Sequence, residues 1–283
     1  MISVIVTDYL RKKYILDALK SIKEQEGIDL KDLELVVVKY YKDKEIDDYI
    51  AYFPIHKNIV LDLKGPRHVG YTDAKGLEAA SSNIIFFLED DDLFVKDKVK
   101  RILEIMKKTN KTNYAIHHKQ IYVDENKEIT TPNTDYDKIA WHNVSSFVLN
   151  IDKNSKLDLI EKISKIEGAP DMLLYYFKNN LIQLNDRLTY YRILRNSLSH
   201  MINAEKLEKF LHDYEYIQKT IRNNVLISKI IFNAKIYLNL FYDKSYSITI
   251  KDVPFNPKSV IRFILYKTNK RLLKAYLSRH LAT

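Results

Sequence analysis

Short apolar runs alternate along the first half of the chain with longer stretches in which apolar residues recur every three or four positions. Short runs are typical of strands buried on both faces, and the longer period is typical of amphipathic helices. The pattern predicts strands at 2–6, 33–38, 58–63 and 84–88 and helices at 15–22, 72–80 and 96–107. Strands that alternate with helices predict a largely parallel sheet with right-handed crossovers, whose ligands bind at the carboxyl ends of the strands.

After residue 112 the spacing becomes less regular. The pattern there predicts strands at 114–123, 144–151, 181–184 and 188–191. Pro170 stands at a helix-start position and predicts a helix over 172–177. From Met201 the apolar period is helical, with one interruption at 243–257. We therefore expect an α/β domain at 1–200, with a change of character after 112, and a helical region at 201–283.

The composition is that of an ordinary globular protein and excludes several kinds of site. The chain has 283 residues, 46% hydrophobic and 29% charged, which excludes a fibre or a disordered chain. The absence of cysteine excludes disulfides, zinc–thiolate sites and thiol catalysis. The five glycines form no phosphate-binding loop, so a nucleotide must be held by side chains and a metal. The sequence contains no uninterrupted apolar run of membrane-spanning length, and its first residues predict a strand rather than a signal peptide, which favours a cytoplasmic location.

The net charge of +9 is concentrated at the C-terminal end. Seven of the 46 Lys and Arg residues and none of the 37 Asp and Glu residues lie at 253–283, so the rest of the chain is nearly neutral. This distribution disfavours a nucleic-acid binder. On one helical wheel the tail has an apolar arc and a separate basic arc. The apolar arc contains Ile261, Ile264, Leu265, Leu272 and Tyr276, and the basic arc contains Lys267, Lys270, Arg271 and Lys274. Such a helix either lies on the anionic inner face of a membrane or packs against the protein body with its basic face in solvent.

The predicted strand at 84–88 runs directly into four acidic residues, Glu89, Asp90, Asp91 and Asp92. Two carboxylates 4 Å apart repel by about 4 kcal/mol at an effective dielectric constant near 20, so a counter-charge is expected. Mg²⁺ or Mn²⁺ takes one or two carboxylates and fills its remaining positions with water and substrate phosphates, which connects this site to a nucleotide diphosphate. The alternative is that Asp92 caps the helix beginning near Lys96 and that the other acids are solvated loop residues.

Three separated segments share their order and spacing with a known family. They run from Ser3 to Ile22, from Gly76 to Asp92, and from Tyr190 to Ser199. Over roughly residues 2–200 the chain resembles family 2 glycosyltransferases of the GT-A fold. The resemblance implies a Rossmann-like α/β fold with a mixed, mostly parallel sheet flanked by helices. It also implies a nucleotide-sugar-binding half at 1–112 and an acceptor-binding half at 113–200.

The resemblance assigns roles residue by residue. Glu89 and Asp91 occupy the outer positions of the family's DxD element, with Asp91 and Asp92 as ligands of Mn²⁺ or Mg²⁺. Asp171 resembles the catalytic base that removes the proton of an acceptor hydroxyl. Its alternative role is that of an acid favoured by a helix N-terminus. Tyr9 matches the aromatic residue that stacks on the nucleotide base, and the nucleotide-sugar-binding set is Tyr9, Arg11, Lys39, Asp73, Glu89 and Asp90.

Several positions depart from the family pattern. Lys39 and Tyr40 stand where acidic residues help to hold the base, Asp73 and Ala74 replace an Arg-Asn pair, Pro170 replaces a Glu, and Leu194 replaces a His. His117, His118 and Trp141 lie where acceptor contacts are expected. The resemblance implies a metal-dependent inverting glycosyltransferase that moves a sugar from a nucleotide diphosphate to a hydroxyl of a glycan or a lipid-linked acceptor. The alternative is a non-catalytic module that binds a sugar nucleotide or a glycan.

Overall fold

The computed structural model describes residues 1–9, 11–130, 143–194, 203–221 and 224–281. The chain divides into two compact units, unit 1 at Met1–Ser197 and unit 2 at Leu198–Thr283. We describe each unit by itself.

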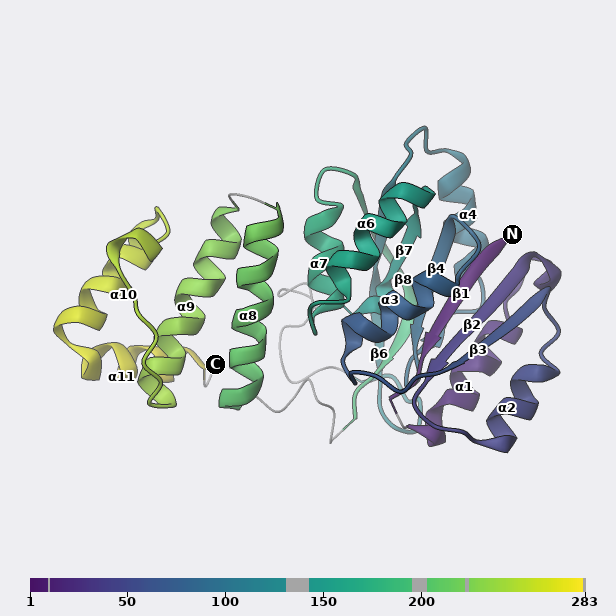
Figure 1. The fold of residues 1–283 in the computed structure, drawn as a ribbon, viewed down its shortest axis with the longest axis horizontal. Helices are drawn as coiled ribbons and strands as arrows, with labels where there is room; N and C mark the ends of the chain where they lie inside the picture. Colours follow the sequence, from purple (N-terminus) through teal and green to yellow (C-terminus); the bar gives the residue numbers. More distant parts are fainter. Residues whose placement is uncertain (10, 131–142, 195–202, 222–223, 282–283) are drawn as a thin grey trace. The chain divides into compact units, whose positions relative to one another are not determined.

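Unit 1 is a mixed sheet with helices on both faces, which confirms the expected fold class (Figure 1). Its strands are β1 (Ile2–Thr7), β2 (Leu33–Lys39), β3 (Lys57–Asp62), β4 (Ile84–Glu89), β5 (Leu93–Phe94), β6 (Tyr114–Val123), β7 (Phe147–Asn150) and β8 (Leu181–Arg192). Its α-helices are α1 (Lys12–Lys23), α2 (Lys44–Ala51), α3 (Val69–Ala79), α4 (Lys98–Lys107), α6 (Lys153–Ile163) and α7 (Ala169–Tyr176). Two single 3-10 turns, η1 (Leu30–Asp32) and η2 (Val144–Ser146), precede β2 and β7.

The sheet order is β3-β2-β1-β4-β7-β6-β8-β5. The first four strands are parallel, with Ile5 of β1 between Val36 of β2 and Phe87 of β4. β7 runs antiparallel to both β4 and β6, β8 is parallel to β6, and β5 is antiparallel to β8. One continuous sheet therefore joins the two predicted halves of the domain. The carboxyl ends of β1, β2 and β4 meet at a single edge, where ligands of parallel sheets bind.

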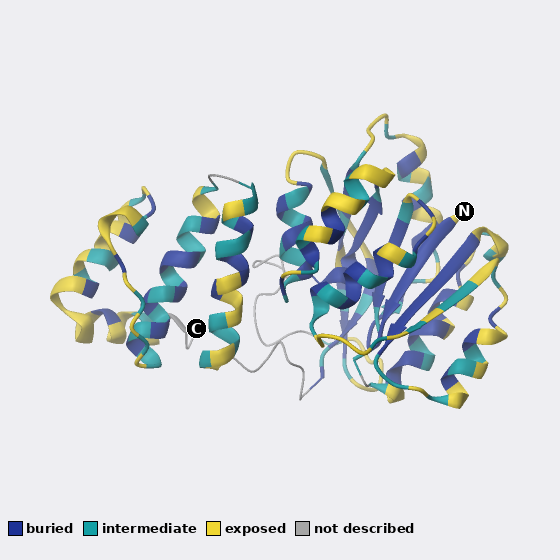
Figure 2. Cartoon of the chain, viewed as in Figure 1, coloured by how far each residue is buried: buried dark blue, intermediate teal, exposed yellow. Residues whose placement is uncertain are grey.

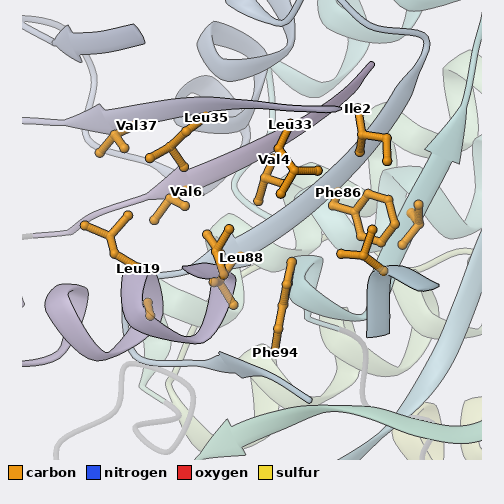
Figure 3. Packing of buried hydrophobic residues seen from close by; sticks show 14 of the residues in the cluster. Ile2, Val4, Val6, Leu19, Leu33, Leu35, Val37, Phe86, Leu88 and Phe94 are labelled. Carbon is orange, nitrogen blue, oxygen red and sulfur yellow. The ribbon is translucent and has the colours of Figure 1, made fainter. Parts of the chain in front are cut away.

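Apolar side chains cover both faces of the parallel strands. On one face Val4, Leu35 and Phe86 pack in a core shared with α1, α2 and α4 (Figure 3). On the other face α3 approaches β1 so closely that a methyl group added at Gly76 would lie 2.3 Å from Cγ2 of Ile5. Burial on both faces explains the unbroken apolar runs of β1, β2 and β4. The edge strand β3 is partly exposed along its length (Figure 2).

The pattern predicts two strands at 181–184 and 188–191, whereas the structure has the single strand β8. Its register against β6 shifts between His118 and Lys119 and again between Lys119 and Gln120. The exposed polar residues at 185–187 lie at this irregularity, and in the sequence they have the composition of a turn. The helices α2 and α6 and the two-residue strand β5 were not predicted. β5 is recognisable only through its pairing with β8.

Unit 2 is helical, as expected. It contains α8 (Ala204–Ile221), α9 (Val225–Phe241), the 3-10 turn η4 (Ile250–Asp252), α10 (Pro257–Thr268) and α11 (Lys270–Leu281). Its core consists of Phe232, Ile236, Leu240, Ile248, Tyr266 and Leu273. The prediction of one amphipathic tail helix is wrong, because the chain breaks at Asn269, whose side chain accepts a hydrogen bond from the backbone N–H of Leu272 at 3.0 Å. Among the described residues, no helix has the length and apolar character needed to span a membrane.

Candidate active site

The acidic residues that follow β4 are buried at the carboxyl edge of the sheet. The exposed fraction is 0% for Asp90, 7% for Asp91 and 1% for Asp92. The backbone N–H of Asp90 donates to the carbonyl oxygen of Thr7 at 3.0 Å, which places the acidic segment beside the end of β1. This burial contradicts the alternative of solvated loop acids. Asp92 does not cap a helix either, because α4 begins at Lys98, directly after Asp97.

Arg11 provides the counter-charge of this acidic segment. Its Nη2 lies 2.5 Å from Oδ1 of Asp90, and its Nη1 donates to Oδ2 of Asp91. Burial alone would lower the pKa of Arg11, but the negative charges of Asp91 and Asp90 outweigh burial and raise that pKa. The guanidinium therefore compensates part of the negative charge of the segment for which the sequence predicts a metal ion.

Asp8 belongs to the same cluster, although the sequence analysis did not single it out. The hydroxyl of Tyr41 donates to Oδ2 of Asp8, and the backbone N–H of Arg11 donates to Oδ1 at 3.1 Å. Burial, together with the neighbouring Asp90, raises the pKa of Asp8 to about 7. The position of Asp8 directly after β1 is the one signal in the sequence that points to it.

Both carboxylate oxygens of Asp92 accept hydrogen bonds from other parts of unit 1. Its Oδ1 accepts a hydrogen bond from the backbone N–H of Arg192 at 3.2 Å, and its Oδ2 accepts one from the side chain of Asn143. Burial raises the pKa of Asp92 to about 6. Asn143 in turn accepts a hydrogen bond from Gln120. These two hydrogen bonds fix the orientation of the Asp92 carboxyl.

Tyr9 and Asp73 lie beside the acidic segment, on the side of α3. The backbone N–H of Tyr9 donates to Oδ2 of Asp90 at 3.1 Å, and burial together with the carboxyl of Asp73 raises the pKa of Tyr9. Asp73 is fully buried, and burial raises its pKa. Within the described part of the chain neither oxygen of Asp73 has a hydrogen-bond partner. A buried carboxyl in this condition is costly unless a proton, water or ligand satisfies it.

Glu89, the last residue of β4, completes this group of acids. Its backbone N–H donates to the hydroxyl of Ser145 at 2.9 Å. Burial, followed by the charges of Asp92 and Asp91, raises the pKa of Glu89. The structure therefore brings together six of the sequence-predicted residues, namely Tyr9, Arg11, Asp73, Glu89, Asp90 and Asp91.

Lys39 stands apart from this group because its charge is already paired. It is fully buried at the end of β2, where its Nζ forms an ion pair with Asp62, lies 3.0 Å from Oδ1 of Asp47 and donates to the carbonyl oxygen of Tyr41 at 2.6 Å. Burial lowers the pKa of Lys39, but Asp62 and Asp47 more than compensate and raise it. These contacts hold the segment after β2, whereas a nucleotide phosphate would have to compete with two carboxylates for Lys39.

Asp171 lies in the first turn of α7, as the helix-start signal of Pro170 predicts. The segment that leads into α7 lies against the start of α3, since Nδ1 of His68 is 3.1 Å from the carbonyl oxygen of Ile166. α3 begins at the carboxyl edge of the sheet and carries Asp73 one turn further on. These contacts place the segment before α7 against the first turn of α3.

Gly70 permits this contact, and replacing it by Ala is expected to weaken it. A methyl group at Gly70 would lie 2.1 Å from the carbonyl oxygen of Ile166 and 2.2 Å from that of Ile163. Both atoms belong to the backbone, so the segment before α7 must shift. We expect Gly70→Ala to lower the free energy of unfolding by about 1–3 kcal/mol in a denaturant titration. Gly65→Ala is the control, because its methyl group meets only the Tyr71 side chain, which can turn away. Equal losses in the two variants would contradict this reading.

The acidic residues have the oxygen ligands that Mn²⁺ or Mg²⁺ prefers. Among the described residues, no three His, Asp or Glu side chains converge on one point. The set therefore fits an ion that takes one or two carboxylates, Asp91 first among them, and completes its shell with water and diphosphate oxygens. Because Nη1 of Arg11 now donates to Oδ2 of Asp91, the positive charge of Arg11 competes with an ion for the same carboxylate.

The remaining sequence candidates are packing residues or lie outside the described part of the chain. His118 is buried, burial lowers its pKa, and its Nδ1 lies 2.8 Å from the carbonyl oxygen of Lys119. The ring of His117 packs on Phe147 with 4.8 Å between centroids. Trp141 and residues 196–199 fall outside the described residues.

Comparison with known proteins identifies the family. A profile described as Glycosyl transferase family 2 matches residues 3–178. No curated protein matches the chain. Among solved structures, residues 1–349 of TarS from S. aureus with UDP-GlcNAc match with a TM-score of 0.61 at 16% identity, covering 94% of this chain and 81% of that one.

A second solved structure is similar over almost the whole chain. The mannosyltransferase PcManGT from Pyrobaculum calidifontis, in complex with GDP-Man and Mn²⁺, matches with a TM-score of 0.58 at 14% identity, covering 99% of this chain and 79% of that one. These likenesses establish the fold, and the family profile covers more than half of the chain. The chain therefore belongs to glycosyl transferase family 2 and is a nucleotide-sugar glycosyltransferase.

Proposed function

We propose that this enzyme is a metal-dependent inverting transferase that moves a sugar from a nucleotide diphosphate to a hydroxyl of a glycan or a lipid-linked acceptor. The observation that carries the proposal is the buried acidic cluster at the carboxyl edge of the sheet, which is balanced by a single guanidinium. Burying several carboxyl groups around one Arg is unfavourable unless the place serves a ligand with its own charges.

Arg11 is the residue that we assign to the donor diphosphate. A guanidinium matches phosphate oxygens with parallel N–H donors, and Arg11 is held at the site by Asp90 and Asp91 before a ligand arrives. Asp91 would hold the divalent ion, which when bound supplies charge stabilisation to the leaving diphosphate. Asp90 keeps its contacts to Arg11 and to the backbone of Tyr9 and so positions both.

Asp171 is the proposed general base. It takes the proton of the acceptor hydroxyl while the hydroxyl oxygen attacks the anomeric carbon from the face opposite the diphosphate. The bond between the anomeric carbon and the diphosphate oxygen breaks, and its electron pair stays on that oxygen. This order inverts the configuration of the sugar and needs no covalent intermediate with the protein.

The group made of Tyr9, Asp73 and Glu89 is the proposed contact surface for the rest of the donor. The carboxyl of Asp73 is a buried acceptor without a partner in the described chain, so a ligand group with N–H or O–H donors would satisfy it. The family pattern has an Arg at this position. Because a carboxyl stands here in place of a cation, we expect the sugar nucleotide to present N–H or O–H groups to it.

Calorimetric titration of UDP-, GDP- and dTDP-sugars, each with and without Mn²⁺, tests the proposal. We expect one nucleotide to bind and its affinity to rise at least about tenfold when Mn²⁺ is present, because Asp91 and the diphosphate then share the ion. Nucleotide sugars that bind equally well with and without Mn²⁺ would contradict metal dependence. No binding by any of them would overturn the proposal.

A non-catalytic module is the second candidate, and the pairing of Lys39 favours it. Lys39 stands where the family has an acid that helps to hold the base, and its charge is paired with Asp47 and Asp62. This candidate predicts nucleotide-sugar binding in the same titration together with neither sugar transfer nor hydrolysis of the donor. Release of nucleoside diphosphate over time distinguishes the two candidates.

A further inference from the structure

The last two helices of unit 2 expose an unusual amount of apolar surface. In α10, Ser259 and Tyr266 are buried, whereas Val260, Ile261 and Ile264 on the other side of the helix have exposed fractions of 41%, 56% and 52%. In α11, Leu273 is buried, whereas Leu272 and Tyr276 are exposed. Both helices therefore have an inner side that packs in unit 2 and an apolar outer side that does not.

The same two helices carry exposed basic residues and no acidic residue. Lys258, Lys267, Lys270, Arg271 and Lys274 are exposed, and residues 253–283 contain no Asp or Glu. Asp252, the last acidic residue before this stretch, accepts hydrogen bonds from the backbone N–H and the hydroxyl of Thr249. Arg262 donates to the side chain of Asn233 at 2.7 Å and packs inward. The exposed lysines also contact rings of unit 2, since Lys267 and Lys270 lie 5.7 and 5.0 Å from the ring centroid of Tyr266 and Lys274 lies 5.2 Å from that of Phe241.

We propose that this basic apolar face, formed by Val260, Ile261, Ile264, Leu272, Tyr276 and the exposed Lys and Arg of α10 and α11, binds the surface of an anionic lipid bilayer. Apolar side chains enter the region between headgroups and acyl chains, while the basic side chains pair with lipid phosphates. Charge complementarity selects this occupant. A second copy of the chain would bring the same positive charge to the same face, whereas an anionic bilayer compensates it.

The two helices lie on the bilayer surface and do not cross the bilayer. The exposed aliphatic residues of α10 stand at positions 260, 261 and 264, one side of the helix, whereas a helix that inserts fully is apolar all round. The inference deepens the proposed function, because an enzyme bound to the bilayer would meet a lipid-linked acceptor there. It does not depend on that function, since the face would bind vesicles whether or not sugar is transferred.

Sedimentation of the full chain with lipid vesicles tests the inference. We expect the protein to bind vesicles of phosphatidylcholine mixed with phosphatidylglycerol, to bind pure phosphatidylcholine weakly, and to lose binding as salt is raised. The charge variant Lys258→Gln/Arg271→Gln should bind mixed vesicles about thirtyfold more weakly, or about fivefold for each charge removed. The apolar variant Ile261→Ser/Ile264→Ser should lose at least about tenfold.

Matched controls keep the result interpretable. Val225→Ser/Leu226→Ser removes two exposed apolar side chains from α9, outside the proposed face, and should bind as the unchanged protein does. Thermal unfolding and Mn²⁺-dependent nucleotide-sugar titration in the absence of vesicles should be unchanged in every variant, so loss of vesicle binding is separable from loss of the proposed enzymatic function. Equal binding to neutral and anionic vesicles, or no binding to either, would overturn the inference. A dimer that dissociates in the Ile261→Ser/Ile264→Ser variant would assign the face to a second copy instead.

Discussion

Replacing Asp171 by Asn is expected to slow sugar transfer by about 10²- to 10⁴-fold while the donor still binds. The amide keeps the shape of the side chain in the first turn of α7 but cannot accept the proton of the acceptor hydroxyl. Arg11 holds Asp90 and Asp91, and the contact of His68 with Ile166 holds the segment before α7, so the donor site should be preserved when the Asp171 side chain becomes an amide. The loss should therefore appear in kcat and leave donor affinity unchanged.

Single-turnover transfer assays and calorimetric donor titration measure the two quantities separately. Glu161→Gln is a suitable control, because Glu161 is an acid at the surface of the neighbouring α6 and pairs with Lys165 in the same helix. Its transfer rate should stay within about twofold of the unchanged enzyme. If Asp171→Asn transfers sugar at the normal rate, Asp171 is an acid that merely favours the start of α7, and the base lies elsewhere. If donor binding is lost as well, the residue has a structural role.

The local apolar pattern was enough to predict the strands whose carboxyl ends form the edge of the site. β1, β2 and β4 are buried on both faces, so each leaves an unbroken apolar run, and the acids that follow β4 must then fall at the carboxyl edge. The same reasoning predicts the start of α7 from Pro170. Residue types and spacing therefore place the acidic segment after β4 at this edge, whereas the roles expected for the individual residues come from the resemblance to the family.

The partners of the acids could not be predicted in this way. Asn143 reaches Asp92 across 51 positions of sequence, and the backbone of Arg192 reaches it across 100. Such hydrogen bonds depend on the order of strands in the sheet, which the apolar pattern does not specify. The sequence around Arg11 likewise gives no signal of its ion pairs with Asp90 and Asp91, because an Arg in a polar segment is usually solvated.

The pairing of charges also explains why departures from the family pattern are hard to interpret from sequence. Lys39 stands where the family has an acid and is open to interpretation as a phosphate ligand, yet the structure gives it Asp47 and Asp62 as partners. Asp73 has the appearance of a surface acid on a helix, yet it is fully buried beside Tyr9. In both cases burial, which tertiary packing determines, decides the chemistry of the residue.

Two substitutions at the acidic cluster are expected to change Mn²⁺ affinity in opposite directions. Asp91→Asn removes the carboxylate that we assign to the ion and should weaken Mn²⁺ binding by about 10²-fold or more, together with Mn²⁺-dependent donor binding. Arg11→Gln removes the cation that now occupies the same oxygen of Asp91 and should strengthen Mn²⁺ binding by about tenfold when no nucleotide is present. The same variant should bind the nucleotide sugar more weakly, because the guanidinium is lost from the diphosphate.

Electron paramagnetic resonance of free Mn²⁺ during titration measures the ion directly and does not rely on turnover. Lys12→Gln is the matched control for Arg11→Gln, since Lys12 is the next residue, carries the same charge and pairs with Asp43 away from the cluster. A general reduction of positive charge would strengthen Mn²⁺ binding in both variants, whereas release of Asp91 would do so only in Arg11→Gln. If Arg11→Gln binds Mn²⁺ no better than the unchanged protein, Arg11 and the ion do not compete for Asp91.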